Sequence, residues 1–110
     1  MMADVTGRIE AEVGAAVEEA AALVEARAKE LCPVRTGRLR DSIRAEVAAM
    51  AGDVLRAEVG TDVAYASAVE MGAGRAAAQP FLLPALDACR EEVRRIIAEA
   101  VRRALRPDAV

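Results

Sequence analysis

The apolar positions near the start of the chain recur every three, four or seven residues, which places them on one face of a helix. Asp4 or Thr6 can cap the start of this helix. Pro33 ends it, because the residue before a proline is pushed out of helical geometry. The pattern predicts a helix over residues 3–31, about 40 Å long, so that one end is expected to project from so small a domain or to pack on a neighbour. The residues on its apolar face are Ile9, Val13, Val17, Ala20, Val24 and Leu31.

From residue 43 onward the apolar pattern changes from helical spacing to strict alternation. Two alternating runs, residues 43–49 and 55–59, flank the turn signal at residues 51–53. Alternation on both sides of a short turn predicts an antiparallel hairpin with one buried face. The residues expected on that face are Ile43, Ala45, Val47, Ala49, Leu55, Ala57 and Val59.

Three segments with weaker patterns connect the regular elements. Residues 33–42 are predicted as a turn-rich connector, in which Gly37 supplies the positive φ of a sharp reversal. Residues 61–71 fit either a short helix or the end of a third strand. Residues 72–80 are mostly small and are predicted as a flexible loop.

A second long apolar stripe at helical spacing occupies residues 84–105. Pro84 suits the first turn of this helix, and Pro107 stops it. Helix, strands and helix in this order predict an α+β fold in a single domain, residues 1–110. It consists of a long N-terminal helix, a small antiparallel β-sheet containing a hairpin, and a long C-terminal helix packed on the sheet. The stripe of the last helix is Leu86, Cys89, Val93, Ile96, Ile97, Ala100, Ala104 and Leu105.

Composition indicates a globular chain with a thin core. Hydrophobic residues make up 55% of the sequence and charged residues 30%, but aromatic residues only 2%. Much of the apolar content is alanine, which removes far less area from water on burial than leucine or phenylalanine does. We therefore expect neighbouring subunits to supply part of the stability.

Charge and length exclude several classes of partner. The net charge of −3 argues against non-specific binding of nucleic acid or anionic membrane. No apolar run reaches the roughly 20 residues of a membrane span, and no signal peptide is evident, so synthesis in a cytoplasm is expected. One basic stretch, with Arg35, Arg38, Arg40 and Arg44, could contact DNA phosphates. A solvated turn, or pairing with acidic residues of a neighbour, is the favoured interpretation.

Catalytic and cofactor chemistry finds little support in the sequence. The chain has no histidine, and nearly all carboxylates fall on solvated helix faces. Cys32 and Cys89 are too far apart for metal-ligand spacing and are expected to be small buried residues. Residues 72–77 fit a G-x-G-x-x-A loop but lack the strand-to-helix setting of a dinucleotide site. We expect no enzyme activity, cofactor, metal or small-molecule substrate.

Two punctuated segments carry a family resemblance. Residues 32–43 read Cys-Pro-Val-Arg-Thr-Gly-Arg-Leu-Arg-Asp-Ser-Ile. Further on come Val59-Gly60-Thr61, Tyr65-Ala66, Val69-Glu70-Met71-Gly72 and Gln79-Pro80-Phe81-Leu82-Leu83-Pro84-Ala85-Leu86. In order and spacing these pieces resemble the phage tail-component family typified by the tenth gene product of phage Hong Kong 97.

The chemistry of the motif residues and of their neighbours indicates structural and contact roles. Tyr65 and Phe81, as the only large rings, are expected to anchor the helices to the sheet. The family-motif residues are Pro33, Thr36, Gly37, Leu39, Ser42, Ile43, Tyr65, Ala66, Glu70, Gly72, Gly74, Pro80, Phe81, Pro84 and Ala85. The candidate inter-subunit contacts are Arg35, Arg38, Arg40, Ala73, Arg75 and Gln79.

The resemblance also implies a function. Members of the family act in the neck or upper tail of a virion, in tail completion or head-to-tail joining. They form rings of copies around the DNA channel, and tail symmetry in the family implies six copies. Expected partners are further copies of the chain and adjacent neck or tail proteins, with passive DNA contact at most. A tail terminator, a minor tail protein, and a non-virion helical interaction module remain the alternatives.

Overall fold

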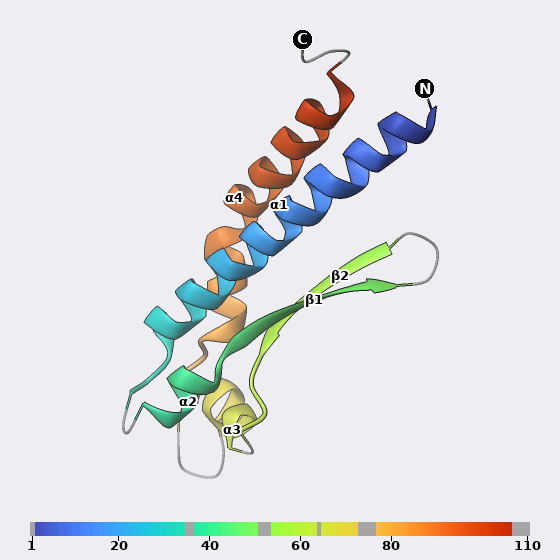
Figure 1. Ribbon diagram of the computed structural model, residues 1–110. Helices are drawn as coiled ribbons and strands as arrows, with labels where there is room; N and C mark the ends of the chain where they lie inside the picture. The colour runs from blue at the N-terminus through green and yellow to red at the C-terminus, as the bar shows by residue number, and fades with distance from the viewer. Residues whose placement is uncertain (1, 35–36, 51–53, 64, 73–76, 107–110) are drawn as a thin grey trace.

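The computed structural model describes residues 2–34, 37–50, 54–63, 65–72 and 77–106 (Figure 1). It confirms the predicted fold class: a long helix, a two-stranded antiparallel sheet and a second long helix. Within residues 61–71 the structure has a short helix, and the described residues of this segment form no third strand. The elements in chain order are α1 (Met2–Leu31), α2 (Arg38–Ser42), β1 (Arg44–Met50), β2 (Val54–Gly60), α3 (Ala66–Met71) and α4 (Leu82–Leu105).

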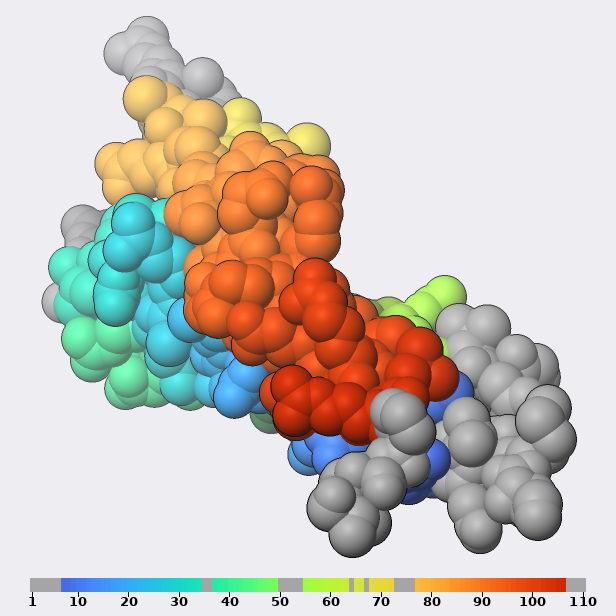
Figure 2. Space-filling view, turned by 90° about the horizontal axis from the view of Figure 1, so that it is seen from above, coloured from blue at the N-terminus to red at the C-terminus, as the bar shows by residue number. Residues whose placement is uncertain are grey.

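The two long helices pack side by side, and α1 is the one that covers the hairpin. Along its length α4 contacts α1, while α1 also contacts both strands (Figure 1). Seen from above, α4 lies over α1 (Figure 2). The last helix therefore reaches the sheet through α1 rather than by packing on it directly.

The molecule is elongated because the two helices extend past the rest of the fold. Its dimensions are 60 × 25 × 20 Å, and its radius of gyration is 17.3 Å. A compact domain of this length has a radius of gyration of about 13 Å. At the far end of the pair, Arg103 Nε donates to Glu12 Oε2 at 3.1 Å, and Arg8 Nη1 donates to the Arg106 carbonyl at 3.3 Å. The N-terminal end of α1 therefore does project from the fold as expected, but it does so together with the C-terminal end of α4.

The predicted hairpin is present, but only part of its apolar face is buried. The strands pair Ala45 with Val59, Val47 with Ala57, and Ala49 with Leu55. Near the base Ile43 is 1% exposed, and Ala45 and Val59 are half-buried. Toward the tip Ala49, Leu55 and Ala57 are exposed, because the strands and α1 separate there (Figure 1). The prediction of one buried face is wrong for this distal half.

Small residues fill most of the interface between α1 and α4. The prediction that Leu31, Leu86 and Leu105 lie on the buried faces of the helices is wrong, because they are 38%, 45% and 54% exposed. The predicted stripes correctly included Ala20, Ala100 and Ala104. They missed Ala16, Ala28 and Ala85, whose small side chains let the two helices approach closely but give a weak apolar signal in the sequence. Among the described residues, the buried positions of the two helices and the residue after α1 are Ala16, Ala20, Ala21, Val24, Ala28, Cys32, Ala85, Cys89, Ala100 and Ala104.

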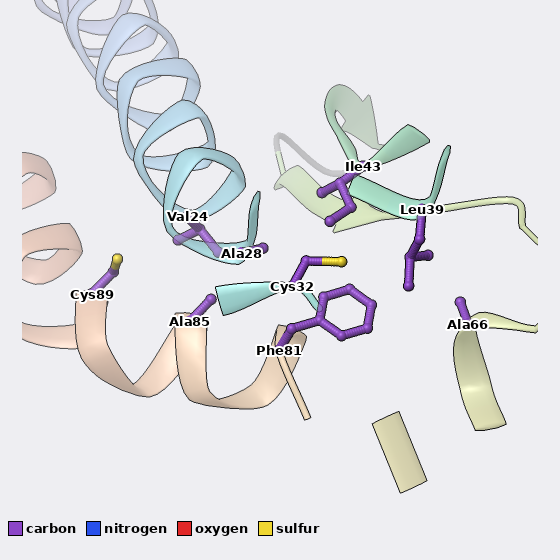
Figure 3. Close-up of a cluster of buried hydrophobic side chains, with 9 residues drawn as sticks. All are labelled: Val24, Ala28, Cys32, Leu39, Ile43, Ala66, Phe81, Ala85 and Cys89. Carbon is purple, nitrogen blue, oxygen red and sulfur yellow. The ribbon is translucent and has the colours of Figure 1, made fainter. Parts of the chain in front are cut away.

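A single aromatic ring closes the base of the fold. Phe81 is 0% exposed and lies at the start of α4, with its ring among side chains from α1, α2 and α3 (Figure 3). Ile43 is the other large side chain of this cluster that is almost fully buried. Tyr65 is 43% exposed, so the expectation that it anchors the helices to the sheet is wrong. The cluster comprises Val24, Ala28, Cys32, Leu39, Ile43, Ala66, Phe81, Ala85 and Cys89.

Enlarging an alanine in the helix interface tests this packing. Ala100→Leu is expected to lower the free energy of unfolding by about 1–3 kcal/mol, because the fully buried site has no room for the added carbons. Urea unfolding followed by circular dichroism measures the change. Ala88→Leu, on an exposed position of the same helix, is the matched control and is expected to change stability by about 0.5 kcal/mol or less. Equal losses in the two variants would contradict the close approach of α1 and α4.

Candidate functional site

The first motif segment forms the joint between α1 and the hairpin. Residues 33–42 were predicted as a turn-rich connector, but they include the helix α2, whose five residues are too few to show a period. Gly37 precedes α2 with φ 86° and ψ −6°, the left-handed conformation that its position in the motif implied. Leu39 and Ile43 then turn inward and are 5% and 1% exposed. The motif therefore directs the chain out of α1 and into β1.

Two hydroxyl groups tie this joint to the end of β2. Ser42 Oγ donates to the Leu39 carbonyl at 2.6 Å and lies 2.5 Å from Thr61 Oγ1. A serine hydroxyl has one hydrogen, so Thr61 is the donor in the second bond. Thr61 Oγ1 also accepts from the Val63 backbone N–H at 3.1 Å. The motif serine thus fixes where the chain leaves the hairpin.

Gly37 and Gly14 provide a matched pair of substitutions with opposite expected signs. Gly37→Ala is expected to cost about 1–2 kcal/mol, because φ is 86° and an L side chain is strained there. Gly14→Ala, inside α1 with no atom within 4 Å of the added Cβ, is expected to stabilise by about 0.5–1 kcal/mol. Thermal unfolding of both variants beside the unsubstituted chain measures the difference. A gain in stability for Gly37→Ala would contradict the positive φ.

In the second motif segment, Glu70 caps the start of α4. Its Oε1 accepts backbone N–H bonds from Phe81 at 3.0 Å and Leu82 at 2.9 Å, and its Oε2 accepts one from Leu83 at 3.2 Å. The first N–H groups of a helix have no partner within the helix, and the helix dipole favours negative charge there. A side chain of α3 therefore completes α4.

The hydrogen bonds also change the acidity of Glu70. Partial burial by itself raises the pKa of the carboxyl group. The backbone N–H groups of Leu82, Phe81 and Leu83 stabilise the charged form and outweigh burial, so the pKa lies below its ordinary value. Glu70 is therefore a charged structural group and is poorly suited to act as a proton donor or acceptor near neutral pH.

The other residues of this segment shape the connection between α3 and α4. Gly72 has φ 83° and donates its N–H to the Ala68 carbonyl at 2.7 Å, which ends α3. Pro84 lies within the first turn of α4, where its missing N–H costs nothing. Ala85 and Ala66 are buried, at 0% and 9% exposed.

The remaining motif prolines are less enclosed than these alanines. Pro33 is half-buried after α1, and Pro80 is exposed just before Phe81. Two motif residues, Thr36 and Gly74, lie outside the described residues.

The candidate contact residues lie on the surface around the joint. The Arg38 guanidinium sits over the Tyr65 ring, 5.8 Å from its centroid, which links α2 to the start of α3. Arg40 pairs with Asp41 at 3.1 Å. Gln79 has an exposed side chain, while its backbone N–H donates to the Val69 carbonyl at 2.8 Å. Arg35, Ala73 and Arg75 lie outside the described residues.

The described residues contain no cluster of three or more potential metal ligands. Cys32 and Cys89 are free and buried, as predicted, and burial raises the pKa of the Cys32 thiol although Arg40 partly opposes this. An open groove of about 610 Å³ runs between α1 and α4, and most of its charged groups are paired, as in Arg95 with Glu92 and Glu99. Of the helices that the structure describes, none combines the length and the apolar character needed to cross a bilayer.

Large apolar side chains are exposed where α1 ends and α4 begins. Val34, after α1, is 57% exposed, and Leu83, in the first turn of α4, is 65% exposed. Met71, at the end of α3, is 76% exposed.

The chain matches a family model over residues 2–72, which is more than half of its 110 residues. The family is HK97-gp10-like, and its description reads "Bacteriophage HK97-gp10, putative tail-component". The chain belongs to this family. The match extends through α1, the hairpin and α3 up to Gly72, so it includes the first motif segment and the capping residue Glu70. Comparisons with curated proteins and with solved structures give no match.

The family match tests the predictions that were made from the sequence. The resemblance predicted from the two motif segments is confirmed for this tail-component family. Sequence reasoning gave no role to Glu70 beyond the motif and missed Glu25, whose Oε1 accepts from the Ala45 N–H at 2.8 Å. Both carboxylates act on distant segments, so no local spacing could have shown their partners. The family supports a structural role in a phage tail, with a location in the virion.

Proposed function

We propose that this protein is a ring subunit of the neck or upper tail of a phage, prophage or phage-derived particle. It acts in tail completion or head-to-tail joining, around the DNA channel, and performs no catalysis. The observation that carries this proposal is the family match over residues 2–72, which includes the joint that the motifs form. Its partners are further copies of the chain and the adjacent neck or tail proteins.

The shape and surface of the subunit support an assembly role. A body 60 Å long with an alanine-rich interior buries little apolar area of its own. Exposed apolar side chains at the base and at the hairpin tip leave area for neighbours to cover. Weak contacts that repeat around a ring give a stable assembly. The reason is that the contact which closes the ring forms within one assembly, so its two surfaces meet at a high effective concentration.

Deletion of the gene in the parent particle tests this function. Filled heads and separate tails are the expected products, since head and tail would each assemble without the joining ring. Tails of uncontrolled length would instead indicate a tail terminator. Normal infectious particles would overturn the proposal. Electron microscopy of the lysate distinguishes these outcomes.

A further inference from the structure

The hairpin has two free edges, and the hydrogen bonds show which residues face them. In an antiparallel pair, successive residues direct their N–H and C=O groups alternately toward the partner strand and away from it. The Ala45 N–H binds Glu25 of α1, so it points away from β2. Val47 and Ala49 on β1 therefore also point outward, as do their register partners Ala57 and Leu55 on β2.

The two edges are not equivalent. At the base of β1, Glu25 occupies the outward N–H of Ala45 at 2.8 Å, which closes that part of the edge. Within the described residues, no hydrogen bond from another element reaches the outward groups of Leu55, Ala57 or Val59 on β2. Soluble monomers normally protect such an edge with charged side chains, proline or a bulge. Over its described residues, the strand β2 carries Arg56 and Glu58 but has no proline, lysine or bulge.

The exposed side chains of the hairpin fit a neighbour of the same kind. Ala49, Leu55 and Ala57 leave the distal apolar face uncovered. The opposite face carries two arginines and two glutamates, paired along each strand as Arg44 with Glu46 and Arg56 with Glu58. A second copy placed alongside would meet equal numbers of positive and negative groups on one face and apolar groups on the other.

We infer that the open edge of β2 binds the free part of the β1 edge of a second copy. The inference rests on the proposed ring function. When the ring axis runs along the strands, rotation about it carries β1 of the next copy beside β2 of the first, and the two strands then run antiparallel. The contact joins two different edges, so it repeats from subunit to subunit.

The closed base of β1 restricts the register of this contact. With Ala45 held by Glu25, only Val47 and Ala49 of the next copy remain to pair with β2. Within one chain Glu58 already faces Glu46. If Ala57 pairs with Ala49 of the next copy, Glu58 lies opposite Ala48 of that copy. If Ala57 pairs with Val47 of the next copy instead, Glu58 lies opposite Glu46 of that copy as well as Glu46 of its own chain. Like charges directly opposite are unfavourable, so the first register is expected.

Ala57→Pro tests the edge while sparing the hairpin. The Ala57 N–H points away from β1, so proline there removes no bond of the internal ladder but prevents pairing with a new strand. The dissociation constant of the oligomer is expected to rise at least about tenfold, measured by native mass spectrometry across a concentration series. Circular dichroism checks that the variant is folded. Ala57→Val, which keeps the N–H, is the matched control and is expected to assemble normally.

Disulfide trapping provides a second test that does not depend on how well the proline variant folds. Chains with Ala57→Cys are mixed with chains that carry Ala49→Cys. Because each chain has only one of the two introduced cysteines, they cannot form a disulfide with each other within one chain. A covalent dimer is expected from the mixture and not from either variant alone, because Cys32 and Cys89 are buried. Dimers from Ala57→Cys alone would overturn the inference in favour of edges that pair β2 with β2.

The outcomes separate this inference from the proposed function. Unchanged assembly of Ala57→Pro together with an absence of mixed disulfides would overturn the edge contact while leaving a ring built through other surfaces. A chain that stays monomeric at every concentration would also overturn it, although deletion of the gene could still separate heads from tails. Normal infectious particles after deletion of the gene would instead overturn the proposed ring function.

Discussion

Phe81→Ala is expected to lower the free energy of unfolding by about 3–5 kcal/mol. The ring is 0% exposed and lies where α1, α2, α3 and α4 meet, so its loss leaves a cavity in the core (Figure 3). A domain of this size has a total stability of about 5–15 kcal/mol, so this loss is a large part of the total. Urea unfolding followed by far-ultraviolet circular dichroism measures the change.

The other aromatic residue of the motif supplies the control. Tyr65→Ala removes an exposed ring and its contact with Arg38, and is expected to cost about 1 kcal/mol or less. Phe81→Leu, which keeps most of the apolar volume, is expected to fall between the two at about 1–2 kcal/mol. Similar losses for Tyr65→Ala and Phe81→Ala would contradict the finding that, of the two aromatic rings, Phe81 lies in the core and Tyr65 does not.

Removing the Glu70 carboxylate is expected to have the second largest effect. Glu70→Ala leaves three backbone N–H groups at the start of α4 without their acceptor, which is expected to cost about 2 kcal/mol. Tm is expected to fall by roughly 10 °C. Glu70→Gln keeps one acceptor oxygen without the charge and is expected to lose about half as much. Glu91→Ala, an exposed carboxylate on α4, is the control, and an equal loss there would contradict the cap.

The stabilising effect of Glu70 depends on pH in a defined direction. Its pKa is lower in the folded chain than the ordinary value of 4.5, so the unfolded chain takes up a proton first as the pH falls. The contribution is fully present above pH 4.5 and is lost as the pH falls through the lowered pKa of the folded state. Unfolding of the natural chain and of Glu70→Gln at a series of pH values is therefore expected to converge in acid. A constant difference would contradict the charged cap.

Sequence patterns predicted the elements that bury a regular face. The helical period gave α1 and α4, and the alternation at Ile43 to Val59 gave the hairpin with its strand order. Each of these elements repeats its signal over several turns or residue pairs. The class of fold followed from their order, because few arrangements of helix, hairpin and helix cover the apolar faces.

Contacts between distant segments could not be predicted in the same way. A stripe of apolar residues shows that a helix has a buried face, but Leu86 and Leu105 show that it does not reveal where the neighbouring helix lies. Glu70 reaches a helix that starts 12 residues further along the chain, and its partners are backbone groups that carry no sequence signal. Gly37 could be predicted, because a positive φ restricts the residue type directly.

The exposed position of Tyr65 has a spectroscopic consequence. The chain has no tryptophan and one tyrosine, so its near-ultraviolet emission comes essentially from this ring. The ring lies 43% exposed beneath the Arg38 guanidinium, beside the joint that both motif segments shape. Its emission therefore reports the solvation of one surface point, and a neighbouring protein that covers the joint would change the signal without any added label.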